Sequence, residues 1–258
     1  MQISFNKNKL IGIMAAMKEE VSSLLNQFEP GTLRKEFIGN RDYHCGKIHG
    51  VDTILVFSRW GKVASASTAT TLINHFGVDF ILFTGVAGAI DESLNIGDIV
   101  VANSLIQHDM DATPFFPRFH IPLTDTYSFP VNENYVQLSQ ISAQKFLKEI
   151  MEKVSLSALK EFEIHHPKCV VGTIASGDQF ISDAEEARNL SQQIKNLMCV
   201  EMEGAAVAQV CHEHDIPFAV VRIISDKANH SSQMDFPKFL EKVASQYSLE
   251  IVRNFLST

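Results

Sequence analysis

The sequence predicts a layered α/β protein with a mainly parallel, mixed sheet. Strand-like apolar runs alternate with helical patterns along most of the 258 residues, an order typical of sheets covered by helices. Two early strand patterns are separated only by a short turn signal, which predicts an antiparallel hairpin and makes the sheet mixed. No composition break or Gly/Ser/Pro linker interrupts the chain, so residues 1–258 are expected to form one domain.

Each expected strand is a short run rich in β-branched or other apolar residues that begins or ends near a turn signal. Gly50-Val51-Asp52 supplies the hairpin turn, and Asn95-Ile96-Gly97 precedes another strand. The run at 80–83 passes directly into Thr84-Gly85-Val86-Ala87-Gly88. The expected strands cover residues 10–16, 43–48, 53–57, 80–83, 98–102, 170–175 and 220–224.

The expected helices have apolar residues at helical spacing or a high content of small residues. Val21, Leu24 and Leu25 show that spacing in the first helix. Between the second and third helices, residues 114–130 are rich in Pro and Phe and predict an ordered loop, because Pro fixes the backbone and Phe favours burial. The expected helices cover residues 18–27, 64–76, 137–160 and 236–255, with a small-residue helix beginning near Gly204.

Composition excludes several classes of function. A formal net charge of -8 and a pI near 5.7 disfavour nucleic-acid binding, which needs clustered Lys and Arg. The N-terminus has no long apolar h-region and the chain has no apolar run long enough to span a membrane, so we expect a soluble, cytoplasmic protein. The cysteines are widely spaced and are expected to be reduced core thiols: Cys45, Cys169, Cys199 and Cys211.

Two strand ends carry acidic residues that indicate a site. The run Val220 to Ile224 ends in Ser225-Asp226, and an apolar segment ends in Val200-Glu201-Met202-Glu203 before the small-residue helix. Open α/β sheets place their chemistry at the carboxyl ends of strands. Asp226 and Glu203 are therefore candidate site residues in one shared pocket. The alternative is structural, with Asp226 capping a turn and Glu203 in a helix's first turn, where negative charge is favoured.

Other motifs are weaker. Gly85 and Gly88 would let a ligand approach the backbone, but GxxG also fits a tight turn and lacks the GxGxxG dinucleotide spacing. The segments 108–111 and 212–214 place His, Asp and Glu close together without the spacing of metal ligands on a helix. No Walker lysine motif or GxSxG elbow occurs. We therefore expect carboxylate chemistry without a metal or cofactor.

Six motifs in series resemble the 5'-methylthioadenosine/S-adenosylhomocysteine nucleosidase family. The resemblance covers about residues 10–256 and implies a nucleoside phosphorylase fold, a three-layer α/β/α sandwich with a mixed sheet, and a homodimer. It also implies hydrolysis of the adenine glycosidic bond in methylthioadenosine, S-adenosylhomocysteine and 5'-deoxyadenosine. The motifs are Ile11–Val21, Thr84–Ala89, Asn95–Val100, Ser176–Ile181, Val200–Ala205 and Ile224–Ala228.

The resemblance also implies a role for each matching residue. Asp226 would protonate N7 of the leaving adenine, and Glu20 would activate the attacking water. Glu203 would accept hydrogen bonds from the ribose hydroxyls, since a carboxylate there also favours an oxocarbenium-like transition state. The supporting contacts are Met202 under the sugar, Ser225 on Asp226, Arg222 paired with Glu203, Phe180 and Ile181 against the purine, and Val86, Ala87 and Gly88 along the substrate.

The chain departs from the family pattern at three places. Val86 stands where many relatives have Ser, which removes a hydroxyl that could touch ribose or water. Trp60, in Arg59-Trp60-Gly61, replaces a smaller residue and is expected near the pocket mouth. The loop from 111 to 117 lacks the usual Gly after its aromatic residue. By family resemblance this loop would reach the partner's pocket in a homodimer, with Ala112, Phe115 and Pro122 around the 5'-substituent.

Two other functions fit the same fold. A phosphate-dependent nucleoside phosphorylase would need basic residues around the phosphate, but Phe83 and Thr84 stand where one is expected, and Glu20 would repel an anion. A non-catalytic nucleoside-binding protein would not need the set of Glu20, Glu203 and Asp226. Hydrolysis of small-molecule adenine nucleosides is therefore the favoured function.

Overall fold

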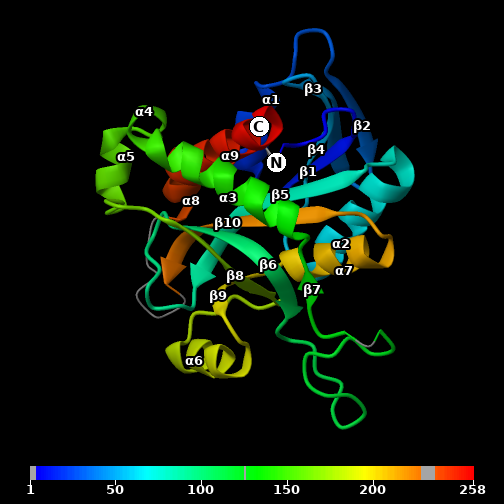
Figure 1. The fold of residues 1–258 in the computed structure, drawn as a ribbon, viewed down its shortest axis with the longest axis vertical. Coiled ribbons are helices and arrows are strands. Elements are labelled where there is room, and N and C mark those ends of the chain that lie inside the picture. Colours follow the sequence, from blue (N-terminus) through cyan, green and yellow to red (C-terminus); the bar gives the residue numbers. More distant parts are fainter. Residues whose placement is uncertain (1–3, 125, 228–235) are drawn as a thin grey trace.

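The computed structural model describes residues 4–124, 126–227 and 236–258 (Figure 1). Residues 1–3 and Ala228, the last residue of the final motif, lie outside this range. The strands are β1 (Ile11–Ala15), β2 (Arg34–Ile38), β3 (Arg41–Ile48), β4 (Val51–Phe57), β5 (Phe80–Ala89), β6 (Ile99–Gln107), β7 (Phe129–Pro130), β8 (Cys169–Ser176), β9 (Leu197–Glu201) and β10 (Phe218–Lys227). They form one mixed sheet, which confirms the predicted fold class.

The helices are α1 (Lys18–Leu25), α2 (Lys62–Thr71), α3 (Glu133–Lys148), α4 (Ile150–Lys153), α5 (Leu156–Glu161), α6 (Ala184–Gln193), α7 (Gly204–Glu213), α8 (Phe236–Phe239) and α9 (Ser245–Ser257). Two π-helical turns extend helices, η1 (Leu72–Phe76) after α2 and η2 (Leu240–Ala244) before α9. The helix predicted over 137–160 is therefore three shorter helices, and the last helix is interrupted once.

The sheet has an unusual junction at β5. This strand lies parallel to β1 and β10 and antiparallel to β9 at its far end. The remaining order, β10-β6-β8-β9, brings the sheet back to β5, while β1, β4, β3 and β2 continue on the other side. The C-terminal ends of β5 and β10 and the end of β9 thus meet in one place, which is where the sequence placed its acidic residues.

Helices cover both faces of the sheet, as side-chain alternation along β1 requires. Ile11 and Ile13 pack in one cluster with Phe255 of α9. Gly12 faces the opposite side, where an added Cβ would lie 3.1 Å from Leu72 at the end of α2. In Figure 1, α3 and α9 lie together across the sheet, and α2 pairs with α7 elsewhere. The result is the three-layer arrangement expected from the family resemblance.

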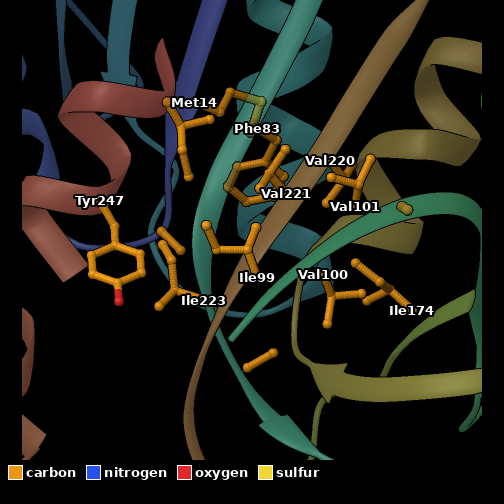
Figure 2. Packing of buried hydrophobic residues seen from close by; sticks show 14 of the residues in the cluster. Met14, Phe83, Ile99, Val100, Val101, Ile174, Val220, Val221, Ile223 and Tyr247 are labelled. Atoms are coloured by element: carbon orange, nitrogen blue, oxygen red, sulfur yellow. The ribbon is translucent and has the colours of Figure 1, made fainter. Parts of the chain in front are cut away.

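The main core lies between the central strands and these helices. Figure 2 shows Phe83, Ile99 and Val221 from three strands in one packed cluster, with Tyr247 of α9 at its side. Phe83, Ile99, Val221 and Tyr247 are fully buried. Burial of a large apolar side chain contributes about 1.5–3 kcal/mol, so this core holds the strand junction rigidly.

Two local expectations differ from the structure. The strand expected over 80–83 continues through 84–88 in β5, so the tight-turn alternative for the GxxG motif is wrong. A Cβ on Gly85 would lie 2.9 Å from Ala16 and 3.3 Å from the Arg222 guanidinium, so this glycine makes room for buried neighbours. The 114–130 loop buries Phe119 but leaves Phe115 86% exposed. The expectation that the phenylalanine rings of this loop are buried therefore holds for Phe119 but not for Phe115.

Candidate active site

A cleft opens where β1, β5, β9 and β10 come together. Most of the predicted site residues line it, and they come from segments far apart in the sequence. Trp60 also lines the cleft, as expected, and its indole N–H donates to the Ala16 carbonyl at 3.2 Å. The predicted residues that line it are Val86, Ala87, Gly88, Phe180, Met202, Glu203, Ser225 and Asp226.

Strand register brings the two predicted acidic segments to one point. Asp226 of β10 lies opposite Gly88 of β5, and Gly88 in turn lies opposite Val200 of β9. Between Ile224 and Asp226 the register shifts by one residue, so Ser225 is an extra residue, a β-bulge. Bulges of this kind redirect side chains at the rims of sheets. The bulge is therefore the local feature that sets the direction of Asp226.

Asp226 is buried and has one oxygen available for a ligand. Its Oδ2 accepts a hydrogen bond from the Ser225 hydroxyl at 2.8 Å, as the sequence predicted. Its Oδ1 is buried and has no hydrogen-bond partner among the described residues. Burial raises the pKa of Asp226 and the Ser225 hydrogen bond opposes that rise. Because a buried polar atom without a partner is costly, this oxygen suits a ligand that supplies one.

Glu203 lies at the N-terminus of α7, with its side chain toward α2. Its Oε1 accepts a hydrogen bond from the Gly61 backbone N–H at 2.8 Å. Burial, and then the nearby charge of Glu201, raise the pKa of Glu203 to about 7, although the Gly61 N–H and Arg222 oppose this. The side chain does not cap α7. The structural alternative for Glu203 therefore does not account for where its carboxylate points.

Glu20 is fully buried and is not among the described residues that line the cleft. Its Oε2 accepts from the Met17 backbone N–H at 3.0 Å and caps α1, while its Oε1 accepts a short hydrogen bond from the Ser248 hydroxyl of α9. Burial raises the pKa of Glu20 to about 7, and the Ser248 hydrogen bond and Arg222 oppose this rise. Met17, the N-cap residue of α1, does line the cleft.

The expected pairing of Arg222 with Glu203 is wrong. The guanidinium of Arg222 donates to Glu201 Oε2 at 3.1 Å and 2.6 Å, and it lies over the Phe83 ring at 4.2 Å. The same carboxylate accepts from the backbone N–H groups of Glu203 and Gly204 and from the Ser176 hydroxyl. Glu201 thus accepts from the backbone N–H groups at the start of α7 and is the counter-ion of Arg222, while Glu203 is the N-cap residue and its own carboxylate points elsewhere.

The other predicted residues lie outside the cleft. Ile181 is buried in a separate apolar cluster with Leu190, which makes its side chain part of the core. Ala112 and Pro122 are half-buried and Phe115 is exposed, all in the segment between β6 and β7 that extends from the body of the molecule (Figure 1). None of these three lines the cleft within one chain.

Sequence reasoning missed two residues that hold the site. Glu201 carried a usable signal, since it is an acid at the end of a buried strand directly before a helix. Ser248 carried none, because it lies 228 residues from Glu20 in a helix of ordinary composition. Among the described residues, no group of three or more His, Cys, Asp or Glu side chains could share a metal ion, and no helix is long and apolar enough to cross a membrane.

Comparison with known proteins first defines a class. The model of the Phosphorylase superfamily matches residues 10–257. A 5'-methylthioadenosine/S-adenosylhomocysteine nucleosidase of Staphylococcus aureus is 36% identical over 236 residues, which is 91% of this chain and 94% of the relative. The chain belongs to the phosphorylase superfamily and, within it, to the family of these nucleosidases.

Solved structures agree with this assignment. An S-adenosylhomocysteine nucleosidase of Streptococcus pyogenes, in complex with 5-methylthiotubericidin, aligns with a TM-score of 0.81 at 33% identity and covers 96% of each chain. The futalosine hydrolase of Helicobacter pylori aligns with a TM-score of 0.82 at 34% identity, covering 96% of this chain and 97% of its own.

Proposed function

We propose that the protein hydrolyses the adenine N-glycosidic bond of 5'-methylthioadenosine and S-adenosylhomocysteine, and of 5'-deoxyadenosine. The products are adenine and the 5'-substituted ribose. The observation that carries the proposal is the buried Oδ1 of Asp226: this residue lines the cleft, and its Oδ1 has no hydrogen-bond partner among the described residues. A purine N7 would supply that partner.

Asp226 is the proposed general acid. Burial raises its pKa, which favours the protonated carboxyl that must deliver a proton to N7 as the bond to N9 breaks. Ser225 holds the other oxygen and so directs the acid. Phe180 is 66% exposed at the cleft and is suited to cover the purine face, while Val86, Ala87 and Gly88 form the floor along β5.

Glu203 is the proposed ribose ligand. Its Oε1 is held by Gly61, and acceptance of hydrogen bonds from sugar hydroxyls would favour its ionised form. A carboxylate beside the sugar also stabilises the positive charge that develops there in the transition state. Met202 packs at the same wall of the cleft. Arg222 acts at a distance, since it holds Glu201, which in turn holds the backbone of Glu203.

Glu20 is the proposed base for water. Both of its oxygens are hydrogen-bonded within the protein, so it must exchange one partner to reach a water in the cleft. Of the two hydrogen bonds that Glu20 accepts, the one from Ser248 joins two side chains. Replacing Ser248 by a water as the donor would leave the backbone hydrogen bond at the start of α1 intact. Val86 offers no hydroxyl for that water, so its placement depends more on Glu20.

We also propose that the protein acts as a homodimer in the cytoplasm. The segment carrying Ala112, Phe115 and Pro122 extends from the body of the molecule and does not line the cleft of its own chain, and the exposed Phe115 is suited to wall the 5'-substituent in a partner's cleft. The four cysteines are free, in keeping with a reducing compartment.

The test is release of the free purine base by the purified protein: adenine from methylthioadenosine, S-adenosylhomocysteine and adenosine, and hypoxanthine from inosine and futalosine, each with and without phosphate. No Lys or Arg is among the described residues that line the cleft, so a phosphate anion has no clamp there. We expect the same rate from methylthioadenosine in both buffers, with free sugar as product. A ribose 1-phosphate as the main product would show that the protein is a phosphorylase, and binding without any release would show a non-catalytic protein.

A further inference from the structure

Three segments around the cleft are joined by a ring of hydrogen bonds that lies outside it. The Lys62 ammonium donates to Asp109 Oδ1 at 2.6 Å. The Asp178 backbone N–H donates to Asp109 Oδ2 at 2.9 Å, and Asp178 Oδ1 accepts from the Lys62 backbone N–H at 2.8 Å. The ring therefore connects the start of α2, the residues after β6 and the residues after β8.

Within this ring, the Lys62–Asp109 ion pair is shielded from solvent more than an ordinary surface ion pair, although Asp178 is exposed. The Lys62 and Asp109 side chains are 18% and 20% exposed, whereas those of Lys47 and Asp52 are 43% and 60% exposed. Partial burial opposes ionisation of Asp109, but the hydrogen bonds from Lys62 and Asp178 lower its pKa. The Lys62 ammonium also donates to Gln107 Oε1 at 3.0 Å. A charge-assisted contact in such surroundings holds its geometry better than an exposed pair.

The ring reaches the carboxylate of the proposed ribose ligand through Gly61. Gly61, next to Lys62, donates its backbone N–H to Glu203 Oε1. Its φ of +90° suits glycine, and an added Cβ would lie 3.0 Å from Asp178 Oδ1. The ring and the turn are therefore packed together, and a shift of Asp109 would move the N–H that holds Glu203.

The segments that the ring joins also carry two walls of the cleft. Trp60 precedes Gly61, and Phe180 follows Asp178 by two residues. Asp109 itself touches neither the cleft nor any proposed substrate atom. Asp109 belongs to the segment 108–111, in which His and Asp residues lie close together. Its carboxylate accepts hydrogen bonds from the Lys62 ammonium and the Asp178 backbone N–H.

We propose that Asp109 is a positioning residue for ribose recognition. Through Lys62 and Asp178 it fixes the Gly61 N–H against Glu203, and thereby orients the carboxylate that accepts the ribose hydroxyls. This inference rests on the proposed function, because it gives Glu203 its ribose-binding role. It predicts that loss of the ring weakens the response to a sugar hydroxyl more than it weakens purine binding.

The test compares Asp109→Asn with wild type on methylthioadenosine and its 2'-deoxy counterpart. An amide keeps the size of the carboxylate but cannot accept from both Lys62 and Asp178 with the same strength. We expect kcat/KM for methylthioadenosine to fall about 10-fold or more, and the preference for the 2'-hydroxyl to fall about 5-fold or more. Asp52→Asn is the matched control, since Asp52 forms an exposed ion pair with Lys47 and is not among the described residues that line the cleft; both values should stay at wild-type levels.

An equal loss of kcat/KM on both substrates would show that Asp109 has a general structural role and would overturn the proposal. An unchanged kcat/KM on both substrates would overturn it as well. If circular dichroism shows that Asp109→Asn does not fold, Lys62→Met removes the other partner of the contact. Its effect is measured as the same ratio of kcat/KM between methylthioadenosine and the 2'-deoxy substrate. Wild type that releases no adenine would instead refute the proposed function. In that case calorimetric affinities of the two nucleosides for wild type and Asp109→Asn give the ratio without turnover, and an unchanged ratio overturns the inference.

Discussion

Asp226 and Glu20 are both buried acids of the proposed site, yet their surroundings differ in kind. Asp226 has one oxygen held by Ser225 and one without a partner among the described residues. Glu20 has both oxygens occupied, by Met17 and Ser248. Burial raises the pKa of each. The difference lies in hydrogen bonding, which leaves one acid open to a ligand and the other engaged with the protein.

This contrast separates two ways to prepare a carboxylate. An unpaired buried oxygen gains a hydrogen bond when a purine arrives, so the cost of its burial is recovered on binding. A paired carboxylate is stable before substrate arrives but must give up a partner to act. We call Asp226 with its hydrogen bonds the acid end of the site, and Glu20 with its hydrogen bonds the base end. Activity should depend at the acid end on the proton of Asp226, and at the base end on the strength of the hydrogen bond from Ser248 to Glu20.

The largest effect is expected from Asp226→Asn, which breaks the acid end. An amide keeps the size of the side chain but cannot deliver a carboxylic proton, and general acid catalysis contributes about 10²- to 10⁴-fold. We expect at least that loss in kcat, with a much smaller change in substrate affinity. The wild-type kcat should fall on the alkaline side as this proton is lost, and the variant's residual rate should lack that limb.

Steady-state kinetics across pH, together with a thermal melt to establish that the variant folds, provide the measurement. Folding should survive because the change removes charge and opens no cavity. Near-wild-type turnover by a folded Asp226→Asn protein would refute the proposed mechanism, even though the family assignment would stand.

A smaller effect is expected from Phe115→Ala, which touches neither end. Loss of this exposed ring should remove apolar contact with the 5'-substituent and cost about 1–3 kcal/mol of binding. KM for thioether substrates should rise much more than kcat falls. Adenosine, which lacks the thioether, serves as the control in the same assay; an equal rise for adenosine would mean that Phe115 is structural and that the interface is wrongly placed.

The smallest effect is expected from Ser248→Ala, which sharpens the base end. The Ser248 hydrogen bond lowers the pKa of Glu20 against the effect of burial, so its removal should raise that pKa above about 7. The acid limb of kcat should then move to higher pH, because Glu20 must be ionised to act as a base. A net hydrogen bond contributes about 0.5–1.5 kcal/mol, so turnover at pH 7 should fall only a few-fold.

Stability gives an independent check on the same group. Burial raises the pKa of Glu20 from its ordinary value of 4.5 to about 7 in the folded protein. Because the unfolded chain loses this proton at lower pH, the free energy of unfolding falls as the pH rises between these two values. Ser248→Ala should steepen that loss, measured as the free energy of unfolding in urea at pH 5 and pH 8. An unchanged pH dependence would show that Ser248 does not tune Glu20.

Hydrophobic patterns predicted the central strands because these strands are buried on both faces, but they failed where burial is slight. The strand β2 was missed because Arg34, Lys35 and Phe37 are all exposed, so no apolar alternation marks it. Helix α6 was missed as well, since Leu190 is its only buried residue. Its signal was polar, with Asp183 as N-cap and acids in the first turn.

The candidate site was predicted to a similar degree and for a similar reason. Asp226, Glu203 and Ser225 stand at strand or helix ends, where a polar residue breaks an apolar pattern, and the structure brings them to one cleft. The partner of Arg222 could not be chosen from sequence, because Glu201 and Glu203 are two residues apart and only the backbone path decides which one faces it. Ser248 needed tertiary structure altogether.

The extra residue at Ser225 makes the direction of the acid depend on a residue count. Removing or adding one residue near the end of β10 would leave Asp226 itself chemically intact, yet it would point its carboxyl to the opposite face of the sheet. A substitution near Ser225 can have a small or a large effect on activity, whereas an insertion or deletion redirects the Asp226 carboxyl in every case. Across relatives, this strand end should therefore tolerate variation in composition while its length stays constant.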